Sequence, residues 1–212
     1  MAAILGCAIT AAGSAPVAAA ATTPTVLTIM GGPTSAADAT PVRLDADLYL
    51  PSVTPAPAIV LAHGFGGSKQ SVADDALALA ARGFVVIAYT ARGFGASTGL
   101  ISMNSPEFEI KDASAVIDDL ATRPEVTLDA PGDPRVGVAG GSYGGALALM
   151  TGGYDSRVDA IAADITWNDL QTSLFGQSII NSTEPGAFKR FWAGTFFSAG
   201  PEALEGAGLC AV

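Results

Sequence analysis

The chain has 212 residues, enough for one domain with a sizeable core; half of them are hydrophobic and 14% are charged. Twenty Asp and Glu residues against ten Lys and Arg give a formal net charge of −10. An acidic surface repels phosphate backbones, which argues against nucleic-acid binding through charge, and the hydrophobic content argues against disorder over the whole chain.

The N-terminal residues are small and apolar, and no charged side chain precedes Asp38. Residues 2–12, followed by an alanine run that ends at Ala21, are typical of a secretory signal peptide with an A-x-A cleavage site, although the usual positive n-region is missing. A membrane anchor is the alternative, but Pro16 and the Ala/Gly-rich composition make a weak span. We predict a signal peptide over residues 1–21, a secreted protein and no stable membrane span.

The chain has two cysteines, Cys7 inside the predicted signal peptide and Cys210 near the other end. Removal of the signal peptide would leave Cys210 alone, and an unpaired thiol is unusual in an exported protein. Either Cys210 is a buried free thiol or its partner lies beyond Val212.

Residues 22–40 are rich in Thr, Ala, Gly and Pro and almost uncharged, which predicts a linker. From Val42 to Leu50 apolar and polar residues alternate, as in a half-buried strand. Continuous apolar runs then predict strands that are buried on both faces, at 58–62, 84–88, 136–139 and 158–165.

Helical spacing of apolar residues separates these strands and predicts helices at 72–80, between Pro106 and Pro124, and at 144–153. The alternating order favours a mostly parallel sheet with helices on both faces. Chemistry in such sheets belongs at the carboxyl ends of the strands. The residues expected there are His63, Phe65, Arg92, Ser142 and Asp164.

Residues 140–144 read Gly-Gly-Ser-Tyr-Gly, a G-x-S-x-G pattern between a predicted strand and a predicted helix. In this pattern the small residues let the backbone turn sharply, so that the hydroxyl of Ser142 is exposed as a nucleophile. The backbone N–H of Tyr143 then faces a developing oxyanion, and the helix N-terminus adds a favourable partial charge.

The loop at 63–67, His-Gly-Phe-Gly-Gly, follows an earlier strand. The second oxyanion donor comes from this loop in such folds, and Phe65 is our candidate. The alternative is that these glycines only make a tight turn. The glycines form neither G-x-G-x-x-G at a strand-to-helix junction nor a P-loop, and one histidine with two cysteines makes no credible zinc cluster. We expect no cofactor and no metal.

Four ordered segments carry a resemblance to a known family: LAHGFGG at 61–67, TARGFGAS at 90–97, DPRVGVAGGSYGG at 133–145 and DSRVDAI at 155–161. They resemble the Xaa-Pro dipeptidyl-peptidase and cocaine-esterase-like hydrolases. The resemblance implies an α/β-hydrolase fold with an inserted helical cap, and a Ser-Asp-His triad that cleaves acyl esters or proline-adjacent peptides. Some members place a tyrosine hydroxyl in the oxyanion hole, where this chain has Phe65.

The triad is incomplete in this sequence, because no histidine follows Ser142. Serine needs a base to accept its proton, and the order in this fold is Ser, then Asp or Glu, then His. The one histidine, His63, is expected to order the oxyanion loop instead. Asp164 is expected to be a structural carboxylate rather than the triad acid.

Beyond Asn168 the strand–helix alternation stops and aromatic residues accumulate: Phe175, Phe188, Phe191, Trp192, Phe196 and Phe197. Helical spacing among them predicts a cap helix over an acyl pocket, or else ordinary core packing. We therefore expect a core over 41–167 and a partial helical cap over 168–212. The chain would then be an incomplete hydrolase fold, a fragment or truncated product, whose last strand is an uncovered apolar edge.

The sequence thus predicts a serine hydrolase that acts on a small ester or peptide, with little turnover by the chain alone. One alternative is a non-catalytic exported binding domain that kept the scaffold. Another is a general carboxylesterase or lipase without a proline preference.

Overall fold

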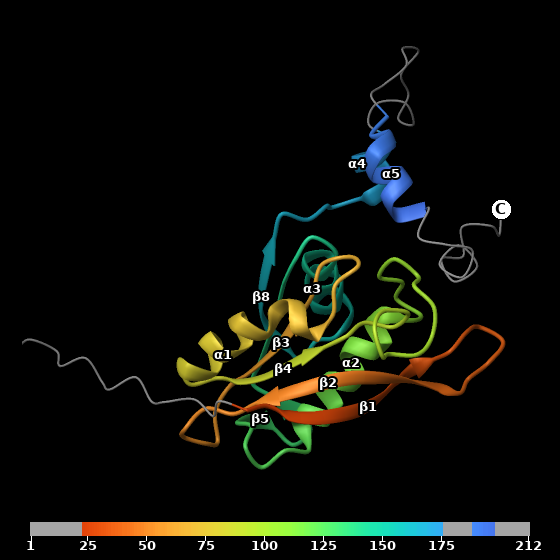
Figure 1. The fold of residues 1–212 in the computed structure, drawn as a ribbon. Coiled ribbons are helices and arrows are strands. Elements are labelled where there is room, and N and C mark those ends of the chain that lie inside the picture. Colours follow the sequence, from red (N-terminus) through yellow and green to blue (C-terminus); the bar gives the residue numbers. More distant parts are fainter. Residues whose placement is uncertain (1–22, 176–187, 198–212) are drawn as a thin grey trace, which may run out of the picture.

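The computed structural model describes residues 23–175 and 188–197, so that the predicted signal peptide and Cys210 lie outside the described residues. A six-stranded sheet has the order β1-β2-β4-β3-β7-β8, and β5 and β6 form a separate two-stranded ribbon (Figure 1). The strands are β1 (Thr25–Pro33), β2 (Pro41–Tyr49), β3 (Ala58–Ala62), β4 (Val85–Tyr89), β5 (Leu128–Ala130), β6 (Asp133–Pro134), β7 (Val136–Gly141) and β8 (Val158–Asp164). The helices are a short 3₁₀ helix (Lys69–Val72), α1 (Ala73–Ala81), α2 (Glu109–Ala121), α3 (Tyr143–Tyr154), α4 (Leu170–Phe175) and α5 (Arg190–Phe197).

The sheet is mostly parallel, as predicted. Strands β4, β3, β7 and β8 pair in parallel, whereas β2 pairs with β4 and β1 with β2 in the antiparallel sense. Every residue of β4 is buried, which explains its continuous apolar run.

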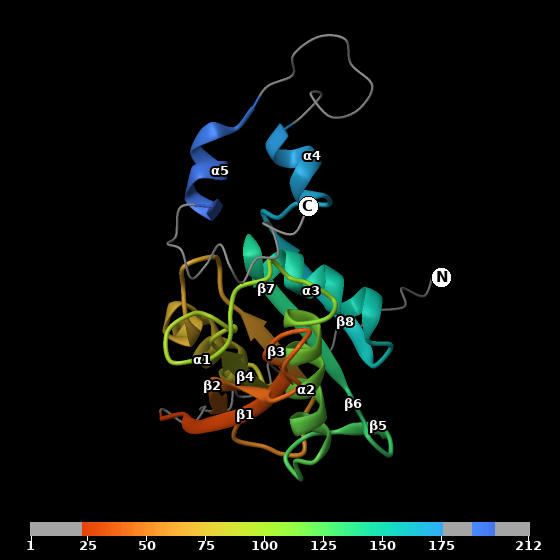
Figure 2. The same cartoon turned by 90° about the vertical axis from the view of Figure 1, so that its right-hand side faces the viewer.

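Helices cover both faces of the sheet, and this prediction is also confirmed (Figure 2). Helices α2 and α3 pack on one face over the larger apolar core, and α1 packs on the other face. The predicted inner face of α2 is correct, because its four apolar positions are at most 2% exposed: Ile110, Ala113, Ile117 and Leu120.

The predicted linker over 22–40 is wrong at residues 25–33, because these form strand β1, which pairs with β2 from Thr25↔Leu48 onward. Contacts from distant residues hold this strand. The N–H of Gly32 donates to the Asp112 carboxylate at 2.7 Å, and Arg92 donates to the carbonyl of Pro33 at 2.9 Å. The folded core therefore begins near Thr25.

Neighbouring strands β3 and β7 send the chain to opposite faces of the sheet. The chain passes from β3 to α1 on one face and from β7 to α3 on the other. Where connections diverge in this way, a crevice opens at the carboxyl ends of the strands. The loop after β3 begins at His63 and the turn after β7 begins at Ser142, so both predicted site segments lie at this crevice.

Strand β8 lies at one edge of the sheet, as predicted for the last strand. The prediction that residues 158–165 are buried on both faces is wrong, because β8 pairs only with β7 in the described parts of the chain and six of its seven residues are exposed. On the α1 side, Ile59, Phe84 and Ile161 help to line a hollow of about 330 Å³ beside it. None of the helices in the described parts of the chain is long and apolar enough to cross a bilayer.

Candidate active site

Ser142 occupies the predicted sharp corner between β7 and α3. Its backbone has φ 54° and ψ −116°, a conformation that non-glycine residues rarely adopt and that the surroundings must enforce. Three hydrogen bonds do so: the Ser142 N–H donates to Asp164 O at 2.9 Å, and Ser142 O accepts from Ala146 N at 3.0 Å and Thr166 Oγ1 at 2.7 Å. The strain is thus anchored by β8 and by the first turn of α3.

Glycines on both sides of Ser142 let the corner pack directly on β3. A Cβ atom on Gly140 would lie 2.7 Å from Ala62 O, and one on Gly144 would lie 2.7 Å from Ala62 C and 2.8 Å from His63 O. Because these neighbours are backbone atoms, no rotamer change in a neighbouring residue could make room for a side chain at either position. The G-x-S-x-G spacing therefore has a steric cause in this chain.

The two predicted oxyanion donors lie on segments that meet at this corner. Tyr143 is the first residue of α3, where backbone N–H groups have no acceptor within the helix. A Cβ atom on Gly64 would lie 4.0 Å from the Ser142 Cβ, so the loop after β3 runs close to the nucleophile just before Phe65. The oxyanion roles of Tyr143 and Phe65 remain predictions.

His63 orders the loop, as the sequence predicted. Its Nε2 accepts the N–H of Ala91 at 3.0 Å, and its Nδ1 lies 2.7 Å from the carbonyl of Gly64. Burial lowers the pKa of His63, which favours the neutral ring. Because Nε2 accepts the Ala91 N–H, the proton of the neutral ring lies on Nδ1, which donates to the carbonyl of Gly64. With both nitrogens engaged, His63 is not available as the base for Ser142.

Ser142 helps to line a cavity of about 360 Å³ between the core and the helices that follow β8. Much of its wall is apolar and aromatic, with contributions from Trp167, Leu170, Leu174, Trp192 and Phe196. The Phe196 ring lies 5.1 Å from Phe65 and 5.8 Å from Trp167, and these contacts join α5 to the oxyanion loop. A concave apolar site with few polar groups is typical of a small-molecule pocket.

A family model described as X-Pro dipeptidyl-peptidase (S15 family) matches residues 38–200. The chain belongs to this family. The match spans the strained serine, the loop after β3 and the helices that border the cavity. It confirms the resemblance recognised in the sequence, and with it the α/β-hydrolase fold.

The chain is also similar to two curated bacterial proteins. The chain is 35% identical over 132 residues to protein PA2218 of Pseudomonas aeruginosa, covering 60% of this chain and 34% of the relative. It is 30% identical over 138 residues to the quorum-quenching protein AidA of Acinetobacter baumannii, covering 62% of this chain and 43% of AidA. The chain thus spans less than half the length of both relatives.

Solved structures show the same fold. The crystal structure of PA2218 has a TM-score of 0.60 and 24% identity, covering 92% of this chain and 58% of that one. Acetyl xylan esterase 1 from Thermoanaerobacterium has a TM-score of 0.59 and 18% identity, covering 85% of this chain and 58% of that one.

No histidine follows Ser142 in the sequence, and the role of Ser142 as a triad nucleophile stays a prediction. Asp164 ends β8 with an exposed side chain, and its recorded contact with Ser142 is made by its backbone carbonyl. The expectation of a structural carboxylate at Asp164 stays a prediction. In the portion of the chain that the structure describes, no three His, Cys, Asp or Glu side chains are grouped to hold a metal ion.

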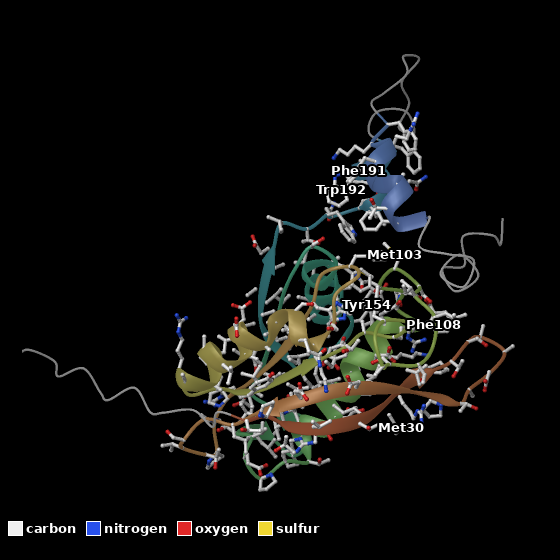
Figure 3. All side chains as sticks on the ribbon, viewed as in Figure 1. Met30, Met103, Phe108, Tyr154, Phe191 and Trp192 are labelled. Atoms are coloured by element: carbon white, nitrogen blue, oxygen red, sulfur yellow. The ribbon has the colours of Figure 1, made fainter. Side chains whose placement is uncertain are left out.

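The aromatic tail is only partly where the sequence predicted it. Trp192 and Phe196 lie on α5 and line the cavity, whereas Phe175 and Phe188 stack on each other at 5.1 Å. Phe191 and Trp192 both project from α5, and Met103 lies at the end of the core nearest this helix (Figure 3). Phe191 is 77% exposed and does not line the cavity.

Sequence reasoning missed a buried polar cluster beneath the nucleophile. The Tyr143 hydroxyl donates to Glu109 Oε1 at 3.3 Å, and Asn104 Nδ2 donates to the carbonyl of Tyr143 at 3.0 Å. Glu109 also accepts the backbone N–H groups of Ser102 and Ser105. The loop before α2 is thereby tied to the residue that follows Ser142.

The pKa of Glu109 is raised to about 6, because burial penalises its charged form more than the backbone N–H groups favour it. Its ordinary value is 4.5, so the unfolded chain loses this proton first as the pH rises. Stability conferred by Glu109 is therefore complete below about pH 4.5 and falls as the pH rises through 6.

We predict a pH-dependent difference in stability between the wild type and Glu109→Gln. The unfolding free energy of the wild type, minus that of the variant, should fall by about 2 kcal/mol between pH 4 and pH 7. Urea unfolding of both proteins across this range measures the difference, and groups common to the two cancel. Glu107→Gln is the control: Glu107 is exposed, and hydrogen bonding to Ser105 lowers its pKa, so its difference should not fall. A flat curve for Glu109→Gln contradicts the raised pKa.

Proposed function

We propose that this chain carries the nucleophile of a secreted serine hydrolase that cleaves acyl esters or Xaa-Pro-type peptide bonds through an acyl-enzyme on Ser142. The observation that carries the proposal is the left-handed backbone of Ser142 at the β7–α3 junction, where the residue borders an apolar cavity. Backbone strain of this kind is costly and is concentrated at functional sites.

The surroundings of Ser142 suit attack on a carbonyl carbon. The hydroxyl would give its proton to the triad base and add to the carbonyl carbon, and the resulting oxyanion would accept hydrogen bonds from Tyr143 N–H and Phe65 N–H. Collapse of this intermediate would break the bond to the alcohol or amine, which leaves with the proton from the base, and the acyl group stays on Ser142. Each such N–H donor typically stabilises the transition state by about 3 kcal/mol. The positive end of α3 adds to this effect, and the aromatic wall would receive the acyl group.

The acid and the base of the triad are proposed to come from polypeptide outside this sequence. Two facts support this: no histidine follows Ser142, and both ring nitrogens of His63 are engaged. The chain also covers only 34% of PA2218 and 43% of AidA, which agrees with this proposal. Without a base, the 212-residue chain should turn over esters several orders of magnitude more slowly than a complete enzyme.

Fluorophosphonate labelling with added imidazole tests this function. Imidazole can enter a cavity and act as an external base, so we expect labelling of Ser142 to accelerate with imidazole concentration and to be absent in Ser142→Ala. Peptide mass spectrometry identifies the labelled residue. Equal labelling of the wild type and Ser142→Ala at every imidazole concentration would exclude Ser142 as the nucleophile, and brisk ester turnover without imidazole would refute the expected inactivity.

A non-catalytic exported binding domain is the second candidate, favoured by the missing histidine. The strained corner argues against it, because a binding protein gains nothing from the strain. A carboxylesterase or lipase without a proline preference would use the same Ser142 chemistry. Comparing ester substrates with Xaa-Pro amides on the complete protein separates this possibility from a proline-directed peptidase.

A further inference from the structure

Among the described residues that line the cavity beside Ser142, one is charged, Lys189, and the rest of that wall is apolar or bears hydroxyl groups. Because the chain carries a formal net charge of −10, its overall field disfavours anions. A single ammonium group in such a cavity is therefore the feature that would let an anion bind there.

The backbone of Lys189 is held between the two helices that follow β8. Its N–H donates to the carbonyl of Leu174 at 2.8 Å, and its carbonyl accepts the N–H of Ala193 at 3.0 Å. No ion pair of Lys189 occurs within residues 23–175 and 188–197. Its side chain is exposed, and because no ion pair of Lys189 occurs, its ammonium group has no competing carboxylate partner in the described parts.

The apolar wall next to Lys189 is shaped by aromatic rings. Trp192 stacks on Phe196 at 6.2 Å, and Trp167 meets Phe196 edge-on at 5.8 Å. A cavity of about 360 Å³ is at the small end for ligand pockets, which suits one aryl ring or a medium-length alkyl chain.

We propose that this cavity binds a carboxylate attached to an aryl or medium-chain alkyl group, with the anion paired to Lys189 and the apolar part against Trp192 and Phe196. That such a compound is a substrate or product of Ser142 rests on the proposed function; the binding itself does not. Two sources share this chemistry, the free acid released from an ester and the C-terminal carboxylate of a short apolar peptide.

Tryptophan fluorescence of the full 212-residue chain measures this binding, because both tryptophans of the sequence, Trp167 and Trp192, line the cavity. The ligands are octanoate and 4-phenylbutyrate with their uncharged amides, and the dipeptide Ala-Phe with its C-terminal amide. We expect saturable changes, with the carboxylates binding about fivefold more tightly than the amides, as for a partly exposed ion pair. The acids or the dipeptide, whichever binds more tightly, identifies the source.

Lys189→Met should abolish the preference for carboxylates while leaving the binding of amides unchanged, and Lys189→Arg should retain it. Lys111→Met is the matched control, since Lys111 is an exposed lysine on α2 that does not line the cavity. Equal affinity for acids and amides in the wild type overturns the inference, as does a preference that survives in Lys189→Met or a lack of any saturable change.

Ser142→Ala separates the two proposals. Carboxylate binding should persist in this variant, because the nucleophile is not the anion partner. If the chain binds carboxylates but is never labelled at Ser142, the proposed function fails and the binding site stands. If labelling depends on Ser142 but acids and amides bind alike, the hydrolase stands and the anion site fails.

Discussion

Replacing Arg92 by methionine should lower the free energy of unfolding by about 3–5 kcal/mol. Arg92 is fully buried, and its guanidinium makes two hydrogen bonds of 2.7 Å to the Asp112 carboxylate, which is 1% exposed. Removing one partner leaves the other charge buried without compensation. Arg92 also donates to Pro33 O, so its loss should loosen β1 as well. Urea unfolding gives the free energy, and hydrogen exchange of the β1 amides reports the strand.

Two further variants test whether burial of the ion pair is what makes the Arg92→Met substitution so destabilising. Arg135→Met breaks a pair with Asp129 in which the arginine is 55% exposed, so its cost should be much smaller than that of Arg92→Met. The double variant Arg92→Met/Asp112→Leu removes both charges and should recover much of the lost stability. If Arg92→Met costs no more than Arg135→Met, the buried pair does not hold β1 in place.

Gly144→Ala should destabilise the fold by about 3 kcal/mol, and more if β3 is displaced. The added methyl would overlap the backbone of Ala62 and His63, which a rotamer change cannot relieve. Because His63 O and Ala62 belong to the strand end that leads into the oxyanion loop, Ser142 labelling in the presence of imidazole should slow as well. Urea unfolding and the labelling rate are the two measurements.

Gly153→Ala is the matched control, since it makes the same change near the other end of α3. A Cβ atom at Gly153 would have no neighbour within 4 Å, so only the helix propensity of alanine should act, a gain of up to about 1 kcal/mol. Equal effects of the two substitutions would show that close packing of α3 on β3 is not what requires glycine at position 144.

Local patterns were sufficient to predict the parts of the fold that are buried along a continuous segment. Strand β4 is buried at every residue, and the inner face of α2 repeats with helical spacing, so both were predicted correctly. The corner at Ser142 was predicted from the G-x-S-x-G spacing. Two of its glycines, Gly140 and Gly144, are required because the backbone there packs closely on the end of β3. Each of these features leaves a local pattern in the sequence, even at Gly140 and Gly144, whose packing partner is the distant strand β3.

Features that depend on distant residues were missed. Strand β1 has the composition of a linker and is held by Arg92 and Asp112, which lie about 60–80 positions away. Glu109 has no pattern of its own, and its role arises from hydrogen bonds to Ser105 and Tyr143. Lys189 and Trp167 come together with Ser142 only through the placement of α4 and α5.

The open edge of β8 has a consequence for how groups can reach Ser142. The nucleophile follows β7, which is the immediate neighbour of β8, and the N–H of Ser142 is already bonded to the last residue of β8. A further strand that paired in parallel with β8 would end at the edge of the sheet where β7 and β8 end. The residues that follow it would therefore lie next to the cavity. A strand that paired in the reverse direction would bring its first residues there instead. The direction of pairing with β8 would therefore determine which end of an incoming segment can supply a proton acceptor to the serine.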